Sequence, residues 1–299
     1  MRIGIWIDDD KPLPDVLAAI EDAAERGFAR AWLAQRFGWD ALTVLAAVGD
    51  RAPEIELGTA IVTTYPRHPM ALAGQALTVG VATGGRLSLG IGPSHRVLME
   101  GAFGYPWDRP ALHTREYLDV LLPLLRGEPV EVHGETVTAV GEVSAPAASA
   151  PPVLLSALGP VMLRLAGERT EGTITAWTGP RGLDEHVVPL IMRAAAGRPA
   201  PQVVAGVAAV VTADVEGARR WVAERFGRAG ELPSYRAVLD RQGIARAEDT
   251  VLIGDEAVME KELRRYADAG ATEFQLCPVG PEKDQARTID LFGDLARIS

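Results

Sequence analysis

The stretch LGTAIVTTYPRHPMALAGQALTVGVATGGRLSLGIGPSH, from Leu57 to His95, decides how this chain folds. It contains two short apolar strands, within EIELGTAIV and RLSLGIG, and one amphipathic helix between them. At its C-terminal end each strand enters a loop of small and polar residues. In a parallel α/β protein, helix N-termini and free backbone amides converge at that end, so ligands bind there.

The same alternation of apolar runs and helical periods continues along the whole chain. We predict eight strands, over Arg2–Ile7, Arg30–Leu33, Glu56–Val62, Leu87–Ile91, Val153–Ser156, Gly172–Trp177, Gln202–Val211 and Thr272–Cys277. Alternating strands and helices predict a parallel sheet, and eight such units predict a closed (β/α)8 TIM barrel. We find no linker-like composition shift, and therefore expect a single domain over residues 1–299.

Two stretches interrupt the alternation, after strands four and seven. Pro129–Pro152 contains a predicted hairpin, VEVHGETVTAV, and then the run SAPAASAPP. This run cannot propagate a helix, so we interpret it as a lid or connecting loop. Ala213–Asp255 contains a predicted helix over Val215–Phe226 and another near Tyr235–Arg241. We expect both stretches to be insertions into the barrel.

Composition excludes several classes of function. The net charge of −10 argues against nucleic-acid binding, which requires a basic face. The apolar run in MRIGIWIDDD is too short for a signal peptide or for a membrane span. Cys277 is the only cysteine, so no intramolecular disulfide can form. These features predict a cytoplasmic protein that acts on a small molecule.

Aromatic and polar residues follow several of the predicted strands. Gln35, Arg36 and Trp39 follow strand two, Tyr65 follows strand three, and Trp177 ends strand six. A planar, aromatic ligand requires a pocket of this kind, with apolar walls and a few polar groups. Each aromatic residue could instead only pack the top of the barrel. We assign Gln35, Arg36, Trp39 and Tyr65 to a substrate pocket.

The segment PPVLLSALGPVMLRLAGE predicts a strand that runs directly into a helix N-terminus. Ser156, Ala157, Leu158 and Gly159 precede Pro160, which suits a first helical position because proline has no N–H. Exposed amides and the positive end of a helix dipole favour a phosphate group. A plain strand-to-helix turn would have the same sequence, so both interpretations stay open here.

Other common chemistries lack their patterns. The five histidines show no i, i+4 pair and there is no C-x-x-C, so we predict no metal site. Ser94 and Ser156 lack the G-x-S-x-G elbow of a hydrolase. Asp8 and Asp40 are the nearest candidates for a glycosidase pair, but Asp40 precedes a helix at Ala41 and is expected to cap it.

The order of several motifs resembles the luciferase-like oxidoreductases over nearly the whole chain. The motifs are GTAI at strand three, YPRHP after it, GGRLSLGIG into strand four, LLSALGP at strand five, LAGERTEGTITAW into strand six, and GDE before a late helix. Within this superfamily, the strings YPRHP, GIGPSH and LPSYRAVLD resemble an actinobacterial-type subgroup that uses the deazaflavin coenzyme F420.

The resemblance implies a barrel that binds the deazaflavin ring at its mouth, usually in a homodimer. A non-proline cis peptide would lie at Ala60–Ile61, under the ring. Gly92, Ser94, His95 and Trp177 would surround the ring, and the amides from Ser156 to Val161 would hold the phosphate. The Ala- and Leu-rich helices over Leu42–Val48 and Met70–Ala82 could form the dimer contact. Several branches carry an acid and a histidine after strand two, where this chain has Gln35 and Arg36.

The function implied is an oxidoreductase that transfers a hydride between coenzyme F420 and a small substrate with an activated C=C, C=O or C=N bond. His95 is our candidate catalytic proton donor, because an unperturbed imidazole titrates near neutrality. Two alternatives stay open. One is an FMN-dependent monooxygenase of the luciferase type, and the other is a barrel that binds a deazaflavin without catalysis.

Overall fold

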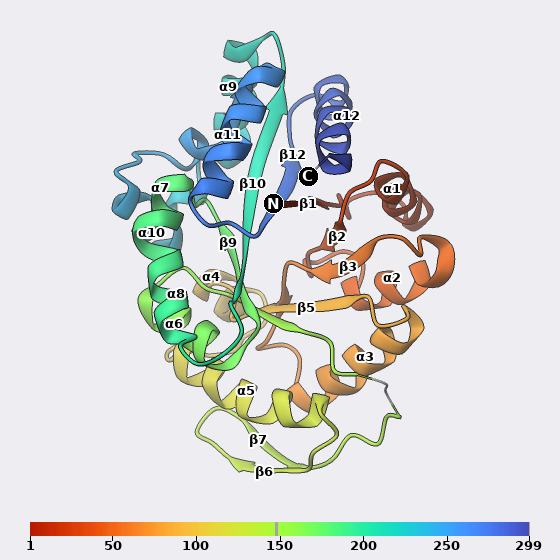
Figure 1. Cartoon of the computed structure of the whole chain (residues 1–299). Coiled ribbons are helices and arrows are strands. Elements are labelled where there is room, and N and C mark those ends of the chain that lie inside the picture. The colour runs from red at the N-terminus through yellow and green to blue at the C-terminus, as the bar shows by residue number, and fades with distance from the viewer. Residues whose placement is uncertain (147–148, 299) are drawn as a thin grey trace.

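The alternating pattern of the sequence folds into a closed parallel barrel (Figure 1). The structure is a computed structural model that describes residues 1–146 and 149–298. Residues 147 and 148, within the predicted lid or connecting loop, lie outside the described residues, as does residue 299. The predicted (β/α)8 architecture is confirmed, with insertions after the fourth and seventh barrel strands.

Eight strand positions make up the barrel wall. They are β1 (Arg2–Trp6), β2 (Arg30–Leu33), β3 (Glu56–Thr59) with its continuation β4 (Val62–Thr63), β5 (Leu87–Gly92), β8 (Val153–Ser156), β9 (Gly172–Ala176), β10 (Gln202–Val211) and β12 (Glu273–Pro278). The barrel closes where β12 pairs with β1, with Arg2 opposite Glu273. All of these pairings are parallel, so the C-terminal ends of the strands share one mouth.

The third strand is not continuous, although the sequence predicts one strand over Glu56–Val62. The peptide bond between Ala60 and Ile61 is cis, at the predicted position, and it separates β3 from β4. The end of β2 holds this bulge by two backbone hydrogen bonds. The Ala60 N–H donates to the Leu33 carbonyl (2.7 Å), and the Gln35 N–H donates to the Ile61 carbonyl (3.1 Å).

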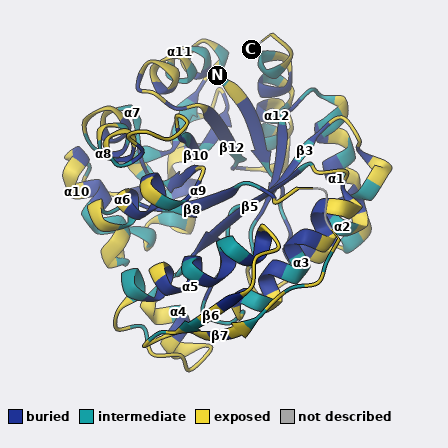
Figure 2. Ribbon diagram, turned by 60° about the horizontal axis from the view of Figure 1, so that its bottom comes forward, coloured by how far each residue is buried: buried dark blue, intermediate teal, exposed yellow. Residues whose placement is uncertain are grey.

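Helices surround the barrel and bury their apolar sides against it (Figure 2). They are α1 (Leu13–Glu25), α2 (Ala41–Val48), α3 (Pro69–Ala82), α6 (Pro160–Arg169), α7 (Pro180–Gly182), α8 (Val188–Ala194), α11 (Glu256–Asp268) and α12 (Glu282–Arg297). Side chains cap both α2 and α3, and the cap of α2 is the predicted one. Asp40 accepts from the Thr43 N–H at the start of α2, and His68 accepts from the Met70 N–H at the start of α3.

The insertion after β5 contains two helices and the predicted hairpin. Its elements are α4 (Arg96–Gly101), α5 (Pro110–Leu125), β6 (Val130–His133) and β7 (Thr138–Gly141). The two strands pair antiparallel, with Val132 opposite Ala139. This hairpin packs beside α5, on the outside of the barrel (Figure 1).

The insertion after β10 contains α9 (Val215–Phe226), α10 (Pro233–Gln242) and β11 (Leu252–Gly254). Both helices are predicted, but β11 is not, because three residues are too few to form a recognisable strand pattern. It pairs with the distal end of β10, with Val210 opposite Ile253. Val210, Val222 and Val279 form a separate small core there, against which Trp221 and Phe226 of α9 pack.

The interior of the barrel is filled by one large side chain. Trp32 is fully buried and packs with Leu154, Ile174 and Val204, which lie on strands across the barrel. Glycines on the neighbouring strands leave room for its ring. A Cβ atom at Gly58 would lie 2.5 Å from Trp32 Cε3, and one at Gly4 would lie 2.9 Å from Trp32 Nε1.

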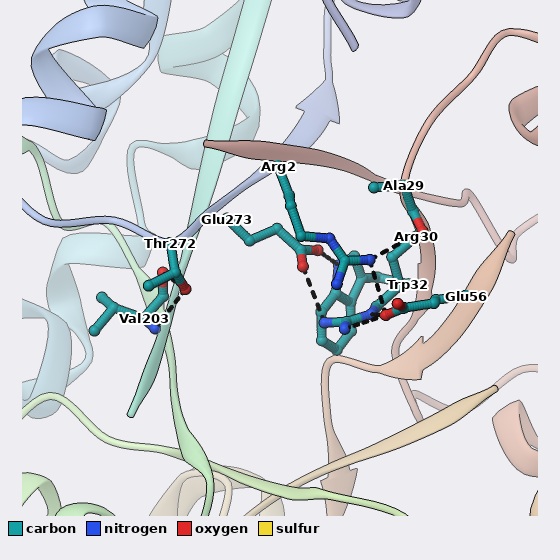
Figure 3. A network of polar contacts seen from close by, with 8 residues as sticks. All are labelled: Arg2, Ala29, Arg30, Trp32, Glu56, Val203, Thr272 and Glu273. Atoms are coloured by element: carbon teal, nitrogen blue, oxygen red, sulfur yellow. Dashed lines mark hydrogen bonds and ion pairs between the residues drawn. The ribbon is translucent and has the colours of Figure 1, made fainter. Parts of the chain in front are cut away.

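A buried polar network closes the N-terminal end of the barrel (Figure 3). Glu273 accepts a hydrogen bond from Trp32 Nε1 (2.6 Å) and pairs with Arg30 (2.9 Å), and Arg30 also bonds to Glu56. Burial raises the pKa of the Glu273 carboxyl above its usual value, and the Arg30 guanidinium opposes part of that rise. With Trp32 and Arg30 as its hydrogen-bond partners, the Glu273 carboxylate fixes the position of the Trp32 ring.

In the part of the chain that the structure describes, every helix is too short or too polar to cross a bilayer.

We expect Gly58→Ala to lower the free energy of unfolding by about 1–3 kcal/mol, because its methyl group would collide with the Trp32 ring inside a packed barrel. Urea unfolding followed by circular dichroism measures this change. Gly80→Ala in α3 is the control, since a Cβ there meets nothing within 4 Å. Equal midpoints for Gly58→Ala and the wild type would show that the barrel has spare volume.

Candidate functional site

A cavity of about 1000 Å³ opens at the mouth of the barrel. Its walls come from the C-terminal ends of β1, β8, β9, β10 and β12, the bulge between β3 and β4, and the helices α9 and α10. Aromatic side chains dominate these walls, namely Trp6, Trp177, Trp221, Phe226, Tyr235 and Tyr266. A volume of this size suits a cofactor together with a small substrate.

Five of the residues predicted for the site line this cavity. They are Arg36, Ala60, Ile61, Ser156 and Trp177. Gly92 lies directly beside them, because a Cβ atom there would lie 3.1 Å from Ser156 Cβ and 3.3 Å from Ile61 Cδ1. The structure therefore brings the bulge and the ends of β5, β8 and β9 together, and small residues form a shallow floor.

The end of β9 is held by α10. The Gln242 amide donates to the Trp177 carbonyl (3.0 Å) and accepts from the Gly179 N–H (2.6 Å). Trp177 has a positive φ of 56°, a conformation that a non-glycine residue adopts only when its surroundings enforce it. Its indole lies edge-on to Phe226 and to Tyr235, with ring centroids 5.6 Å and 6.0 Å apart.

His95 faces the cavity through Tyr235 rather than directly. His95 Nε2 lies 3.1 Å from the Tyr235 hydroxyl, and Nδ1 lies 3.3 Å from the Ser234 hydroxyl. Ser94, which precedes it, has a positive φ of 63°. Burial lowers the pKa of the His95 imidazole below its usual value, so the ring is neutral at neutral pH. Tyr235 lines the cavity and separates His95 from it.

Burial raises the pKa of the Tyr235 phenol, and a hydrogen bond from the Trp177 side chain opposes part of that rise. The phenol therefore keeps its proton at neutral pH. Its ring also lies edge-on to His95, with centroids 4.8 Å apart. These contacts fix the hydroxyl of Tyr235 at the cavity surface.

Arg36 stands among three acids at the end of β1. It donates from Nε to Asp9 (2.9 Å), lies within ion-pair distance of Asp8 and Asp10, and covers the face of Trp6 at 5.2 Å. Burial alone would lower the pKa of Arg36, but the pairing with Asp9 outweighs it and raises the pKa. The positive charge that lines the cavity here is thus balanced by carboxylates.

Three residues assigned to the substrate pocket lie outside the cavity lining. The Gln35 side chain accepts from the Ala41 N–H (3.0 Å) at the start of α2. Trp39 donates from Nε1 to the Lys11 carbonyl (2.9 Å), and Tyr65 stacks on His113 with centroids 3.8 Å apart. A strand-end position does not determine where a side chain points, and these three side chains satisfy local partners instead.

The predicted phosphate segment leads from the cavity to the start of α6. Ser156 lines the cavity, Ala157 is buried, and the Leu158 carbonyl lies 3.1 Å from His186 Nε2. Gly159 occupies the N-cap without a side-chain hydrogen bond, and a Cβ there would meet nothing within 4 Å. Pro160 and Val161 border a separate groove of about 470 Å³ with Arg164 and Arg193. The first amides of α6 are therefore uncapped by side chains.

Sequence reasoning missed the contribution of the second insertion. Tyr235, Trp221 and Phe226 belong to α9 and α10, and nothing in their local pattern places those helices over the mouth. The string LPSYRAVLD, which contains Tyr235, was the available signal. Trp6 lies one residue inside the end of the predicted strand Arg2–Ile7, so its position indicates a strand residue and gives no sign of a cavity wall. Over the described ranges, the structure gathers no group of three or more His, Cys, Asp and Glu residues able to hold a metal ion.

The fold and the mouth-facing cavity define a ligand-binding barrel of the luciferase-like class. A sequence profile described as luciferase-like monooxygenase matches residues 1–292, and the chain belongs to this family.

Particular relatives share this architecture. One is a protein of Mycobacterium tuberculosis whose provisional name is coenzyme F420-dependent oxidoreductase Rv3520c. It is 32% identical over 60% of this chain and 56% of its own length. The 5,10-methylenetetrahydromethanopterin reductase of Methanolobus tindarius is 28% identical over 98% of both chains. The solved structure of an F420-dependent secondary alcohol dehydrogenase in complex with an F420-acetone adduct superposes with a TM-score of 0.85, at 19% identity over 98% of this chain and 97% of that one.

We expect His113 to make stability depend on pH. Burial lowers its pKa to about 4, with Glu116 working in the opposite direction, whereas an unfolded histidine titrates at about 6.5. The folded state thus resists protonation of His113. The contribution of the neutral imidazole to the free energy of unfolding is therefore complete above about pH 6.5 and is lost as the pH falls toward 4. We expect the urea midpoint, measured from about pH 4.5 to about pH 7.5, to depend less steeply on pH in His113→Gln than in the wild type.

His133→Gln is the control, because His133 is exposed on β6. An unchanged slope in His113→Gln would assign the pH dependence to other groups.

Proposed function

We propose that this chain is an oxidoreductase that transfers a hydride between coenzyme F420 and a small organic substrate with an activated C=C, C=O or C=N bond. One observation carries the proposal: the shallow floor at the bulge and Gly92 adjoins Ser156, from which the chain leads directly into the uncapped N-terminus of α6. A flat ring needs the first feature, and a phosphate attached to it by a tail needs the second. The relatives named for coenzyme F420 support the choice of cofactor.

The residues present fit such a group. Ala60 and Ile61 would support the ring from below, and Gly92 leaves room at its edge because any Cβ there would press against Ser156. Trp177 would border the ring from the end of β9. The backbone N–H groups between Ala157 and Val161, other than at Pro160, would hold the phosphate, aided by the positive end of the α6 dipole.

The substrate would occupy the outer part of the cavity. Trp6, Trp221 and Phe226 give it apolar walls, and Asp8, Asp10 and Glu224 give it acidic groups. Arg36 contributes little free positive charge, because Asp9 is paired with it. We therefore expect a compact, largely apolar acceptor in preference to a polyanionic one.

The protein's own tasks are to bind, to orient and to deliver a proton. When bound, coenzyme F420 supplies or accepts the hydride. His95 is the group that we propose as the source of the proton, which it passes on through the Tyr235 hydroxyl that separates it from the cavity. Ser94 would position His95. Gln35, Trp39 and Tyr65 would act indirectly, by shaping the loops around the mouth.

We also propose a homodimer, located in the cytoplasm. The helices α2 and α3 contain no charged residue, and they expose small side chains such as Ala47 and Ala71 together with Val81. An exposed face without charge suits contact with a second copy.

The single cysteine, Cys277, is consistent with a reducing compartment, and it supports the proposed location in the cytoplasm.

We expect purified protein to bind coenzyme F420 about tenfold or more tightly than FMN, which is a difference of about 1.4 kcal/mol. Titration of each cofactor's fluorescence measures this. Reduced coenzyme should then be oxidised by at least one acceptor from a panel of activated alkenes, ketones and imines. Preference for FMN would support the monooxygenase alternative, and tight F420 binding without oxidation by any acceptor would support a binding barrel.

We expect Gly159→Glu to weaken F420 binding about tenfold or more, because it places a negative charge at the N-terminus of α6. The new side chain enters open space, so folding should be unaffected. Gly159→Gln, of similar size but neutral, is the matched control for sterics. Equal losses from both variants would mean that bulk, not charge, matters, and no loss from either would place the phosphate elsewhere.

We expect light scattering at micromolar concentration to give twice the mass of the chain, and Val81→Glu to give the monomer mass. The reason is that the glutamate would bury a charge within the proposed apolar contact. Val140→Glu is the control, since Val140 is equally exposed on the hairpin strand β7. A monomeric wild type would leave α2 and α3 as coverings of the barrel only.

A further inference from the structure

The hydroxyl of Tyr235 sits where the cavity meets a chain of polar groups that reaches solvent. Tyr235 lines the cavity, His95 lies behind it at 3.1 Å, and Ser234 contacts the far nitrogen of His95 at 3.3 Å. Ser234 is exposed, whereas His95 and Tyr235 are half-buried. The three groups therefore link solvent to the cavity surface.

Hydrogen-bond accounting shows which atom of this chain can donate into the cavity. The Trp177 ring lies edge-on to the Tyr235 ring, with centroids 6.0 Å apart, and it offers the Tyr235 O–H no acceptor, because an indole N–H can only donate. A neutral imidazole has one N–H. If it sits on Nε2, His95 donates to the phenol oxygen, and Nδ1 accepts from the Ser234 hydroxyl. The Tyr235 oxygen is then the acceptor in its bond with His95, and its own O–H is free to point into the cavity.

Several other polar groups of the cavity are poorer donors than the Tyr235 hydroxyl. Asp8 and Asp10 are exposed carboxyl groups within ion-pair distance of the Arg36 guanidinium, and a carboxylate only accepts hydrogen bonds. Burial raises the pKa of the Cys277 thiol to about 12, and Thr178 already donates to the Ala176 carbonyl (3.0 Å). Tyr266 is only 2% exposed. Tyr235 combines exposure to the cavity, a retained proton and a route for its replacement.

We propose that Tyr235 is the catalytic residue that protonates the substrate, and that His95 and Ser234 act through it as a relay to solvent. This inference rests on the proposed hydride transfer and assigns its proton. In the reducing direction, the substrate gains a hydride at the electrophilic atom and a proton from the Tyr235 O–H at its partner atom.

The relay then balances without a net change in the protein. As the Tyr235 O–H bond breaks, the phenol oxygen takes the proton from His95 Nε2, and Nδ1 takes one from the Ser234 hydroxyl. Ser234 recovers its proton from water. After the transfer the imidazole of His95 carries its proton on Nδ1 instead of Nε2. The first tautomer is restored when the ring rotates, or when the hydroxyl protons of Ser234 and Tyr235 shift in the reverse direction. In the oxidising direction every transfer is reversed.

Tyr235→Phe is the direct test, because it removes one oxygen and keeps the ring that packs on Trp177 and His95. We expect kcat with the reduced coenzyme to fall about 100-fold, the usual scale of general acid catalysis. The Kd of the coenzyme and the KM of the acceptor should change by no more than about twofold, since a proton donor acts in the transition state. Tyr105→Phe, at an exposed tyrosine outside the cavity lining, is the matched control.

A second measurement separates the relay from a structural role of His95. In protein labelled with ¹⁵N-histidine, the His95 signals should show a proton on Nε2 and an acceptor at Nδ1. Tyr235→Phe should shift the Nε2 signal, and Ser234→Ala should shift the Nδ1 signal. In turnover, His95→Asn should lower kcat and leave coenzyme binding unchanged, and Ser234→Ala should have a smaller effect because water can replace an exposed hydroxyl.

The possible failures are distinguishable. A wild type that neither binds nor oxidises reduced F420 contradicts the proposed function and the relay with it. Wild-type turnover that survives Tyr235→Phe undiminished contradicts the relay alone. Equal losses in Kd and kcat for Tyr235→Phe would make Tyr235 a wall of the binding site instead of a proton donor. A His95 signal with its proton on Nδ1 would overturn the proposed direction of the hydrogen bonds.

Discussion

The placement of Trp32 inside the barrel is the constraint on which the rest of the structure depends. Its indole needs the space left by Gly4 and Gly58 on the two adjacent strands, and its N–H needs the Glu273 carboxylate on β12. Arg30 compensates that carboxylate in turn. An unpaired carboxylate at this depth would be strongly destabilising, so the ring, the glycines and the ion pair are required together. They close the N-terminal end and leave only the opposite end open.

The open end is shaped by two kinds of structure with different origins. The bulge at Ala60–Ile61 and the floor at Gly92 belong to the barrel, and their positions follow from strand pairing. The outer walls belong to the insertion after β10, which stands on the extended distal half of that strand. Gln242 joins the two parts, since one side-chain amide holds the backbone on both sides of Thr178.

Much of the fold could be predicted from the sequence because its signals are local. Apolar runs and capping residues are local, so β2, β8, β10 and α9 begin and end at the predicted residues. The site was predicted in part. Strand order brings Arg36, Ser156 and Trp177 to one mouth, and the resemblance placed the bulge.

The remainder of the site depends on contacts that no local pattern contains. Gln35 points to the start of α2 and Tyr65 points to His113, although both follow strand ends. Conversely, Tyr235 meets His95 across 140 positions of sequence. Only the packing of α10 against the end of β9 determines that contact.

The small hydrophobic core of the second insertion has a consequence for how this enzyme could diversify. Val210, Val222 and Val279 support α9 without taking part in the packing around Trp32. Replacements at Trp221 or Phe226 would therefore remodel the outer chamber while the floor stays in register. Selection can act on the choice of acceptor independently of cofactor binding, and new specificities can arise without passing through variants that fail to fold.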